Sequence, residues 1–154
     1  MSILKEKSDF YGVGIDLSQK CIDISKINAS KLGIKNRVKF FKSDIDNFRL
    51  GKYDLIISNP PYINNFELSR LDEDIKSHEP KLALSGGSNG FRYIKKVIIK
   101  SKKLLKINGK LIVEIGNKQK KQSIKILKEN GFYINKVSKD LSGKERCIIS
   151  TKFK

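Results

Sequence analysis

The sequence is poor in the residues that build metal centres and disulfide frameworks. Its 154 residues include one histidine and two cysteines, and Cys21 and Cys147 stand far apart without a CxxC spacing. A single histidine, His78, cannot form a histidine-rich site, so we expect no bound metal. We also expect both cysteines to be reduced, buried thiols, as in cytoplasmic proteins.

Long hydrophobic runs are missing as well. No apolar run approaches the roughly 20 residues that a membrane-spanning helix needs. Residues 1–9 alternate charge and polarity, without the apolar core of a signal peptide. The length and the hydrophobic fraction of 38% fit one globular domain. These features predict a cytoplasmic protein of one domain, residues 1–154, with no membrane association.

Acidic residues are scarce beside basic ones. Asp and Glu number 16 against 33 Lys and Arg, which gives a net charge of +17. Such a charge attracts nucleic acid. Nearly all of the cations are lysine, however, and Lys, Ile and Asn are abundant together, which is typical of an AT-rich genome. Lysine also lacks the bidentate geometry of arginine. A nucleic-acid partner therefore stays one alternative among others.

Apolar strand-like segments alternate with amphipathic helical ones along most of the chain. This alternation predicts an α/β fold with a parallel sheet and helices on both faces. The last two strands have no helix between them, which predicts one antiparallel strand near the C-terminus. The predicted strands cover residues 11–16, 38–41, 53–58, 110–115, 132–137 and 146–151. The predicted helices cover residues 19–32, 91–106 and 119–129, with the tail of another at 5–8. Ser18 is the expected N-cap of the helix 19–32, whose apolar stripe includes Ile24 and Ile27, and Asn108-Gly109 is expected to end the helix 91–106.

The most specific motif is Asn59-Pro60-Pro61-Tyr62, directly after the strand 53–58. Prolines fix φ and donate no N–H, so nearby carbonyls stay available as acceptors. The residue before a proline is pushed into extended geometry, which carries Asn59 past the strand end. An amide acceptor, rigid carbonyls and an aromatic face suit a planar nitrogen group, such as an amide or the amino group of a base. The bland alternative is a strand followed by a tight turn.

Two carboxylates follow earlier strands in the same way. Asp16 ends the strand 11–16, and Asp44 comes shortly after the strand 38–41. In dinucleotide-binding folds, an acidic residue at such a strand end takes ribose hydroxyls, and ligands bind at the carboxyl edge of the sheet. Asp16 is placed for the ribose, and Asp44 for an adenine amino group. Either residue alone is equally consistent with a helix cap.

Together these motifs resemble the class I S-adenosylmethionine-dependent methyltransferases, and most of all the release factor glutamine N5-methyltransferases. The resemblance runs from about Ile3 to the C-terminus. The tetrapeptide alone is shared with methyltransferases that act on amino groups of DNA and RNA. The motifs that narrow the resemblance are Asn59-Pro-Pro-Tyr-Ile63, Glu79-Pro80, Ala83-Leu-Ser-Gly-Gly87 with Gly90, Glu114-Ile-Gly116 and Asp140-Leu-Ser-Gly-Lys-Glu-Arg146.

One departure from this family is large. Its catalytic domain opens with a strand and a glycine-rich loop around the methionine part of the cofactor, and neither is found here. Gly12 and Gly14 lie inside a predicted strand and are not that loop. We therefore expect a Rossmann-like sheet without its first, central strand, which normally lies between the strands 11–16 and 53–58. The chain reads as an N-terminally truncated catalytic domain: a gene fragment, half of a split enzyme or a late-start gene model.

The resemblance implies S-adenosylmethionine-dependent methylation of a glutamine side chain in class 1 peptide chain release factors, with a complementing N-terminal fragment as a further partner. It implies S-adenosylmethionine as the cofactor, which this chain by itself would bind weakly or not at all. Two alternatives stay open, a non-catalytic remnant with a basic, RNA-binding surface and an amino-methyltransferase acting on nucleic acid. The implied catalytic residues are Asn59, Pro60 and Tyr62; the cofactor-binding residues are Asp16, Asp44, Ile45 and Asn59; the substrate-binding residues are Asn59, Pro60, Pro61, Tyr62 and Glu79.

Overall fold

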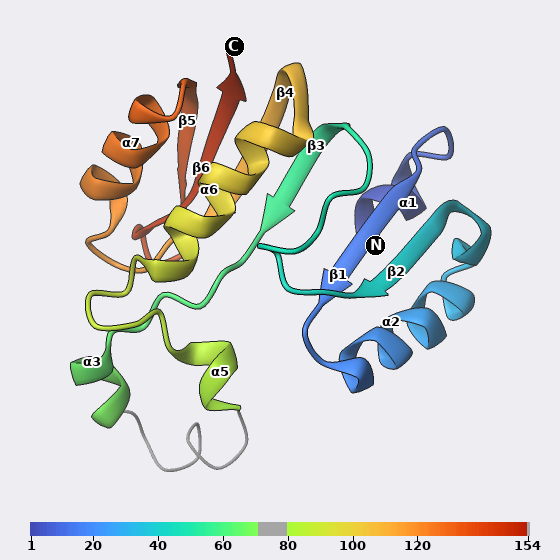
Figure 1. Cartoon of the computed structure of the whole chain (residues 1–154), viewed down its shortest axis with the longest axis horizontal. Helices are drawn as coiled ribbons and strands as arrows, with labels where there is room; N and C mark the ends of the chain where they lie inside the picture. The colour runs from blue at the N-terminus through green and yellow to red at the C-terminus, as the bar shows by residue number, and fades with distance from the viewer. Residues whose placement is uncertain (71–79, 154) are drawn as a thin grey trace. The chain divides into compact units, whose positions relative to one another are not determined.

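A computed structural model describes residues 1–70 and 80–153, and it divides into two compact units. Unit 1 comprises Met1–Phe48 and unit 2 comprises Arg49–Lys154 (Figure 1). Each unit is built around its own β-sheet, with two strands in unit 1 and four in unit 2. Among the described residues, no helix is long and apolar enough to cross a bilayer.

Unit 1 is a small βαβ arrangement. Its elements are α1 (Ser2–Glu6), β1 (Gly12–Asp16), α2 (Gln19–Lys31), a 3-10 turn (Lys35–Arg37) and β2 (Val38–Lys42). The strands β1 and β2 run parallel and in register, with Gly12 opposite Val38 and Asp16 opposite Lys42. Ser18 caps α2 as its side chain accepts a hydrogen bond from the Cys21 amide, as the sequence predicts.

The core of unit 1 is small. Leu4, Ala29 and Ile34 are its buried core cluster, and Leu32, Val38 and Phe40 pack against it. The two glycines of β1 serve this packing. A Cβ at Gly12 would lie 2.8 Å from Leu4 Cδ1, and one at Gly14 would lie 2.7 Å from Phe40 Cδ1. Both glycines thus lie within a strand, as predicted, and each makes room for a neighbouring side chain.

Unit 2 contains a mixed four-stranded sheet in the order β3-β4-β6-β5. The strands β3 and β4 are parallel, whereas β6 runs antiparallel to both β4 and β5. Helix α6 packs along β3 and β4, helix α7 packs against β5 and β6, and the two helices contact each other. The elements are β3 (Tyr53–Ser58), α3 (Asn65–Ser69), α5 (Lys81–Leu84), α6 (Arg92–Leu104), β4 (Leu105–Glu114), α7 (Lys120–Glu129), β5 (Phe132–Lys139) and β6 (Glu145–Lys152).

The α/β prediction is confirmed, as is the single antiparallel strand near the C-terminus, which is β6. The sheet of unit 2 is mixed rather than parallel: β3, β4 and β5 run in one direction, and β6, which lies between β4 and β5, runs against them and forms both antiparallel ladders. The boundary before β4 also differs. Asn108-Gly109 was expected to end a helix, yet it lies inside β4, with Asn108 at φ 63°. The helix ends earlier because Leu105 is fully buried and extended.

Open strand edges border both sheets. Among the described residues, β1 pairs with β2 and β3 pairs with β4, and neither strand has a second partner. Several apolar side chains of β1 and its flanks are exposed, with Tyr11 at 78% and Leu17 at 55%.

Candidate functional site

A turn at the carboxyl end of β3, residues 59–62, presents the acceptors that the sequence predicts; we call it the acceptor turn. Asn59 is exposed, Pro60 is buried, and Pro61 and Tyr62 are half-buried. In the described part of the chain, no hydrogen bond reaches the Asn59 side chain or the Pro60 carbonyl. The Tyr62 carbonyl, in contrast, accepts a hydrogen bond from Gln119 Nε2 at 3.1 Å. The Asn59 side chain and the Pro60 carbonyl are therefore available to a ligand.

The Tyr62 phenol lies beside the end of β4. Its hydroxyl is 3.5 Å from Glu114 Oε1, the carboxylate at the last residue of that strand. Burial and the Glu114 charge raise the pKa of Tyr62, although Arg146 acts in the opposite direction. Burial, together with Glu114, also raises the pKa of the Cys147 thiol. The phenol is thus held in its neutral, hydrogen-bonding form at this edge.

Residues 85–90 form a glycine-rich loop that packs on the acceptor turn, and this loop is distinct from the family's cofactor loop. The Ile63 amide donates to the Leu84 carbonyl at 3.1 Å, and the Gly86 amide donates to the Ile63 carbonyl at 2.7 Å. A Cβ at Gly86 would lie 2.8 Å from Tyr62 Cα, and one at Gly90 would lie 2.5 Å from the Tyr62 carbonyl oxygen. Glycine is therefore required at both positions, because any side chain would displace Tyr62.

Gln119 joins the two loops to the end of β4, and the sequence analysis missed it. Its Oε1 accepts from the Gly116 amide at 2.8 Å, and its Nε2 donates to the Tyr62 and Gly90 carbonyls at 3.1 and 3.3 Å. The residue is 8% exposed. One signal was available, a glutamine three residues after Glu114-Ile-Gly116 at the start of a lysine-rich helix.

Unit 1 holds the predicted carboxylates. Asp16 and Asp44 follow adjacent parallel strands, and the Ser43 amide donates to the Asp16 carbonyl at 2.9 Å. One oxygen of each carboxylate accepts a local backbone amide, from Ser18 at 2.7 Å and from Asp46 at 2.8 Å. Asp16 is exposed, and Asp44 and Ile45 are half-buried. The structure thus brings these three residues to one edge of the unit 1 sheet.

The predictions for Glu79 and for the two cysteines have different outcomes. Glu79 lies outside the described residues. The prediction of buried cysteines is wrong for Cys21, which is exposed, while Cys147 is half-buried; neither forms a disulfide. Within residues 1–70 and 80–153, no group of His, Cys, Asp and Glu could hold a metal. The second oxygen of each of the Asp16 and Asp44 carboxylates accepts no hydrogen bond from the described residues.

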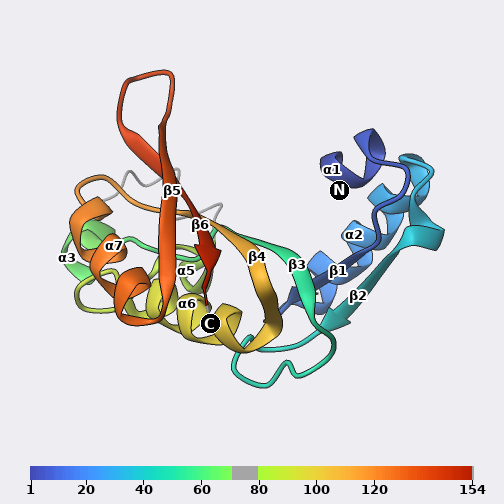
Figure 2. The same ribbon diagram turned by 90° about the horizontal axis from the view of Figure 1, so that it is seen from above.

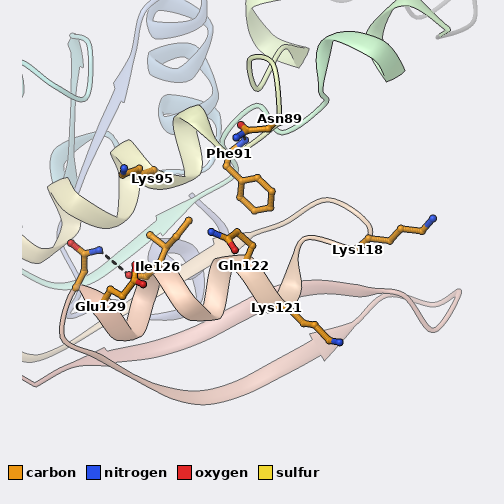
Figure 3. A pocket seen from close by; sticks show the side chains of 9 residues that line it. Asn89, Phe91, Lys95, Lys118, Lys121, Gln122, Ile126 and Glu129 are labelled. Atoms are coloured by element: carbon orange, nitrogen blue, oxygen red, sulfur yellow. Dashed lines mark hydrogen bonds between the residues drawn. The ribbon is translucent and has the colours of Figure 1, made fainter.

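A cavity of about 600 Å³ lies between the start of α6 and helix α7 (Figure 3). Lysine supplies three of its nine lining residues, and Figure 3 shows Lys118 and Lys121 extending away from it. Lys and Arg make up 33 of 154 residues, so about two would line any nine-residue cavity by composition alone. The cavity therefore gives no evidence of a built anion site. Its lining consists of Asn89, Phe91, Lys95, Lys118, Lys121, Gln122, Ile126, Glu129 and Asn130.

The strand order of unit 2 and the acceptor turn at its carboxyl edge define a Rossmann-like α/β domain of the methyltransferase class. The chain belongs to the methyltransferase domain family, whose family model matches residues 3–151. A methyltransferase of Pyrococcus furiosus has a similar structure, with a TM-score of 0.68 at 13% identity over 99% of this chain and 68% of that one. The cyclase SpnF is as similar, with a TM-score of 0.67 at 13% identity, over 98% of this chain and 70% of that one. These two likenesses show the fold alone.

Sequence relatives narrow the family. A release factor glutamine methyltransferase of Clostridium acetobutylicum is 34% identical over 155 residues, 99% of this chain and 54% of that protein. A bifunctional methyltransferase of Rickettsia felis is 35% identical over 150 residues, 97% of this chain and 28% of that protein. The chain is thus related to release factor glutamine methyltransferases, and it spans about half the length of such relatives or less.

Proposed function

We propose that this chain contributes the acceptor site of an S-adenosylmethionine-dependent methyltransferase, and that the acceptor is a glutamine side chain of a class 1 peptide chain release factor. The observation that carries the proposal is the pair of unpartnered acceptors in the acceptor turn, the Asn59 side chain and the Pro60 carbonyl. A primary amide has two N–H donors to match them. The relationship to release factor glutamine methyltransferases supports the choice of glutamine.

The proposed mechanism must overcome the low nucleophilicity of an amide nitrogen. Its lone pair is delocalised into the carbonyl, so it is a poor nucleophile. Two acceptors that each take one amide hydrogen would aim the nitrogen and favour the positive charge that develops on it. Tyr62 would pack against the flat amide group, with Pro61 holding the turn rigid. No strong base is required, because the proton can leave after transfer.

The cofactor, when bound, supplies an electrophilic methyl group. We assign its ribose to Asp16 and its adenine to Asp44 and Ile45, all in unit 1, and Asn59 of unit 2 stays a predicted cofactor-binding residue. The free carboxylate oxygens of unit 1 support this assignment. Weak binding of S-adenosylmethionine by the chain alone stays a prediction, which titration calorimetry measures. A complementing N-terminal fragment is proposed as a second partner, because β1 has one open edge and so does β3.

The test is methyl transfer by the chain, alone and with such a fragment, to a release factor. Asn59→Ala removes one of the two acceptors, and we expect turnover to fall by about 100-fold or more. Folding should be unchanged, because Asn59 is exposed beyond the strand end. Asn117→Ala, another exposed asparagine of unit 2, is the matched control. Unaltered turnover in Asn59→Ala would remove this residue from the mechanism.

The net charge of +17 supports one competing function, methylation of an amino group in nucleic acid. The same two acceptors suit the exocyclic amino group of adenine or cytosine. An acceptor panel separates the two proposals: a release factor, its Gln→Asn variant at the acceptor position, and single-stranded oligonucleotides. Transfer to the oligonucleotides alone would replace glutamine as the substrate, and transfer to nothing would favour a non-catalytic remnant.

A further inference from the structure

The side-chain amide of Gln119 makes three hydrogen bonds, in which Nε2 donates to two carbonyls and Oε1 accepts from one amide. It connects three segments that are distant in sequence, the acceptor turn, the glycine-rich loop and the end of β4. The separations from Tyr62 and Gly90 are 57 and 29 residues. A buried amide with every group satisfied is rigid, since leaving any of its polar groups unpaired costs free energy.

The glycines around Gln119 show that this contact is close on every side. A Cβ at Gly90 would lie 2.7 Å from Gln119 Nε2, and a Cβ at Gly116 would lie 2.9 Å from Gln119 Oε1. The Gly116 position also faces the Tyr62 ring, with Cδ2 at 2.7 Å. Three chain segments therefore approach Gln119 with no room for an additional carbon atom.

The contact restricts the acceptor turn at one end. The two prolines fix φ at two successive positions, and β3 holds the turn at its start. Anchoring the Tyr62 carbonyl then leaves the turn with little freedom. It also occupies that carbonyl, whereas the Asn59 side chain and the Pro60 carbonyl keep no hydrogen-bond partner among the described residues.

We propose that Gln119 is a positioning residue, which locks the acceptor turn through its Nε2 group and so fixes the direction of the two substrate acceptors. The inference deepens the proposed function and rests on it for its meaning in catalysis. The competing reading is a local one, in which Gln119 serves only to satisfy the Gly116 amide before helix α7. The proposal depends on the Nε2 donor of Gln119, whereas the local role depends on its Oε1 acceptor.

Gln119→Glu separates the two halves. A carboxylate still accepts from the Gly116 amide, but it cannot donate to the Tyr62 and Gly90 carbonyls. Gln119→Met removes both functions at similar size. Gln122→Glu and Gln122→Met are the matched controls, because Gln122 is an exposed glutamine on the same helix.

Amide hydrogen exchange reports the result without any enzyme assay. The probes for the turn are the amides of Ile63 and Gly86, which bond to Leu84 and to Ile63, and the probe for the local role is the amide of Gly116. We expect Gln119→Glu to speed exchange at Ile63 and Gly86 by about tenfold or more, with Gly116 still protected. In Gln119→Met all three amides should exchange faster.

Exchange at Ile63 and Gly86 within about twofold of wild type in Gln119→Glu would overturn the proposal. A uniform rise across α7 and the sheet would do the same, because it would indicate a general structural role. If both Gln119 variants fail to fold, Gln119→Asn makes the same comparison, because it keeps a side-chain amide but shortens its reach to the Tyr62 and Gly90 carbonyls. Gln122→Asn is its control, and exchange at Ile63 and Gly86 equal to that of wild type in Gln119→Asn would overturn the proposal.

A kinetic measurement then relates the lock to the reaction. In the methyl-transfer assay, Gln119→Glu should lower kcat by about tenfold or more, with KM for S-adenosylmethionine unchanged. If wild type transfers no methyl group to any acceptor, the proposed function fails, while hydrogen exchange still decides whether Gln119 locks the turn. Normal exchange with a reduced kcat would count against the lock.

Discussion

Tyr62 is the residue at which most contacts of the candidate site meet. Its carbonyl binds Gln119, its hydroxyl lies near Glu114, and glycines at 86 and 116 approach its Cα and its ring. Tyr62 is thus held by two segments, the glycine-rich loop and the stretch from the end of β4 to Gln119. A change at either of them is expected to alter the acceptor turn.

The raised pKa of Tyr62 makes a prediction for alkaline solution. Burial, then Glu114, favours the neutral phenol in the folded protein. The resulting stability is complete below the ordinary value of 10.0 and is lost as the pH rises through the raised pKa. Burial raises the pKa of Tyr53 in the same sense.

We therefore expect the free energy of unfolding, measured in urea, to fall above pH 10, and Tyr62→Phe to make this fall shallower. Tyr133→Phe, at a 56% exposed position, should leave the slope as it is in wild type. Equal slopes in wild type and Tyr62→Phe would show that the phenol ionises without cost to the fold.

The sequence predicted the acceptor turn for a simple local reason. Two prolines after a buried strand restrict the backbone to few conformations, so the local sequence is enough to predict the course of the chain at residues 59–62. Gln119 could not be found in this way, because its partners lie far away in the sequence and a lone glutamine has no distinctive pattern. Polar contacts between loops that are distant in sequence can be identified only when the structure shows which loops lie together.

At the scale of single elements, the β5–β6 hairpin depends on one carboxylate. Figure 2 shows this ribbon projecting from the rest of the unit 2 sheet. Asp140 accepts hydrogen bonds from the Ser142 and Lys144 amides, each at 2.9 Å, and from Arg146 Nε at 2.8 Å. Arg146 is the main cause of the lowered pKa of Asp140, followed by the Lys144 amide.

A lowered pKa stabilises the folded hairpin above the ordinary value of 3.8, and this stabilisation is lost as the pH falls through the lowered pKa. We expect the amides of Ser142 and Lys144 to lose protection from exchange in acid, and Asp140→Asn to show the same loss at neutral pH. Asp54→Asn is the control, because its carboxylate is 83% exposed in a surface ion pair with Lys106. Full protection in Asp140→Asn would contradict the assignment.

Element boundaries were harder to predict than element types. The strand 53–58 was predicted with its observed limits, whereas β4 begins five residues before its predicted start at Lys110. Asn-Gly is a strong stop signal, yet here it lies in a strand whose pairing with β3 is irregular between Tyr53 and Leu55. The burial of Leu105 outweighs the local preference. Side-chain burial in α2 also differs from the prediction. Ile24 and Ile27 were expected on its apolar face, yet both are about half exposed.

At the scale of the whole molecule, the two units differ in the size of their cores. Unit 1 has 48 residues and a core cluster of three buried side chains, Leu4, Ala29 and Ile34. Domains this small are marginally stable without a disulfide, a metal or a partner. Unit 2 buries fully both the β4 residues Leu111 and Val113 and the β6 residue Ile148.

We expect unit 1 to open at a lower free energy than unit 2, which hydrogen exchange in β1 and β4 measures. Ile34→Ala should lower the opening free energy of unit 1 by about 2–4 kcal/mol, with unit 2 unaffected. Ile27→Ala, at a 55% exposed position, is the control. Equal protection of β1 and β4 in wild type would show that the chain unfolds as one cooperative body.

The position of β6 has a consequence for how the chain is made. A ribosome synthesises β4 and β5 before β6, yet β6 is the strand that pairs with both of them. Until residues 145–152 leave the exit tunnel, β4 lacks one neighbour and β5 lacks its only described one. The sheet of unit 2 can therefore close only after residues 145–152 have been synthesised and have left the tunnel, and until then the unpaired edges of β4 and β5, once they have emerged, are open to neighbouring chains or chaperones.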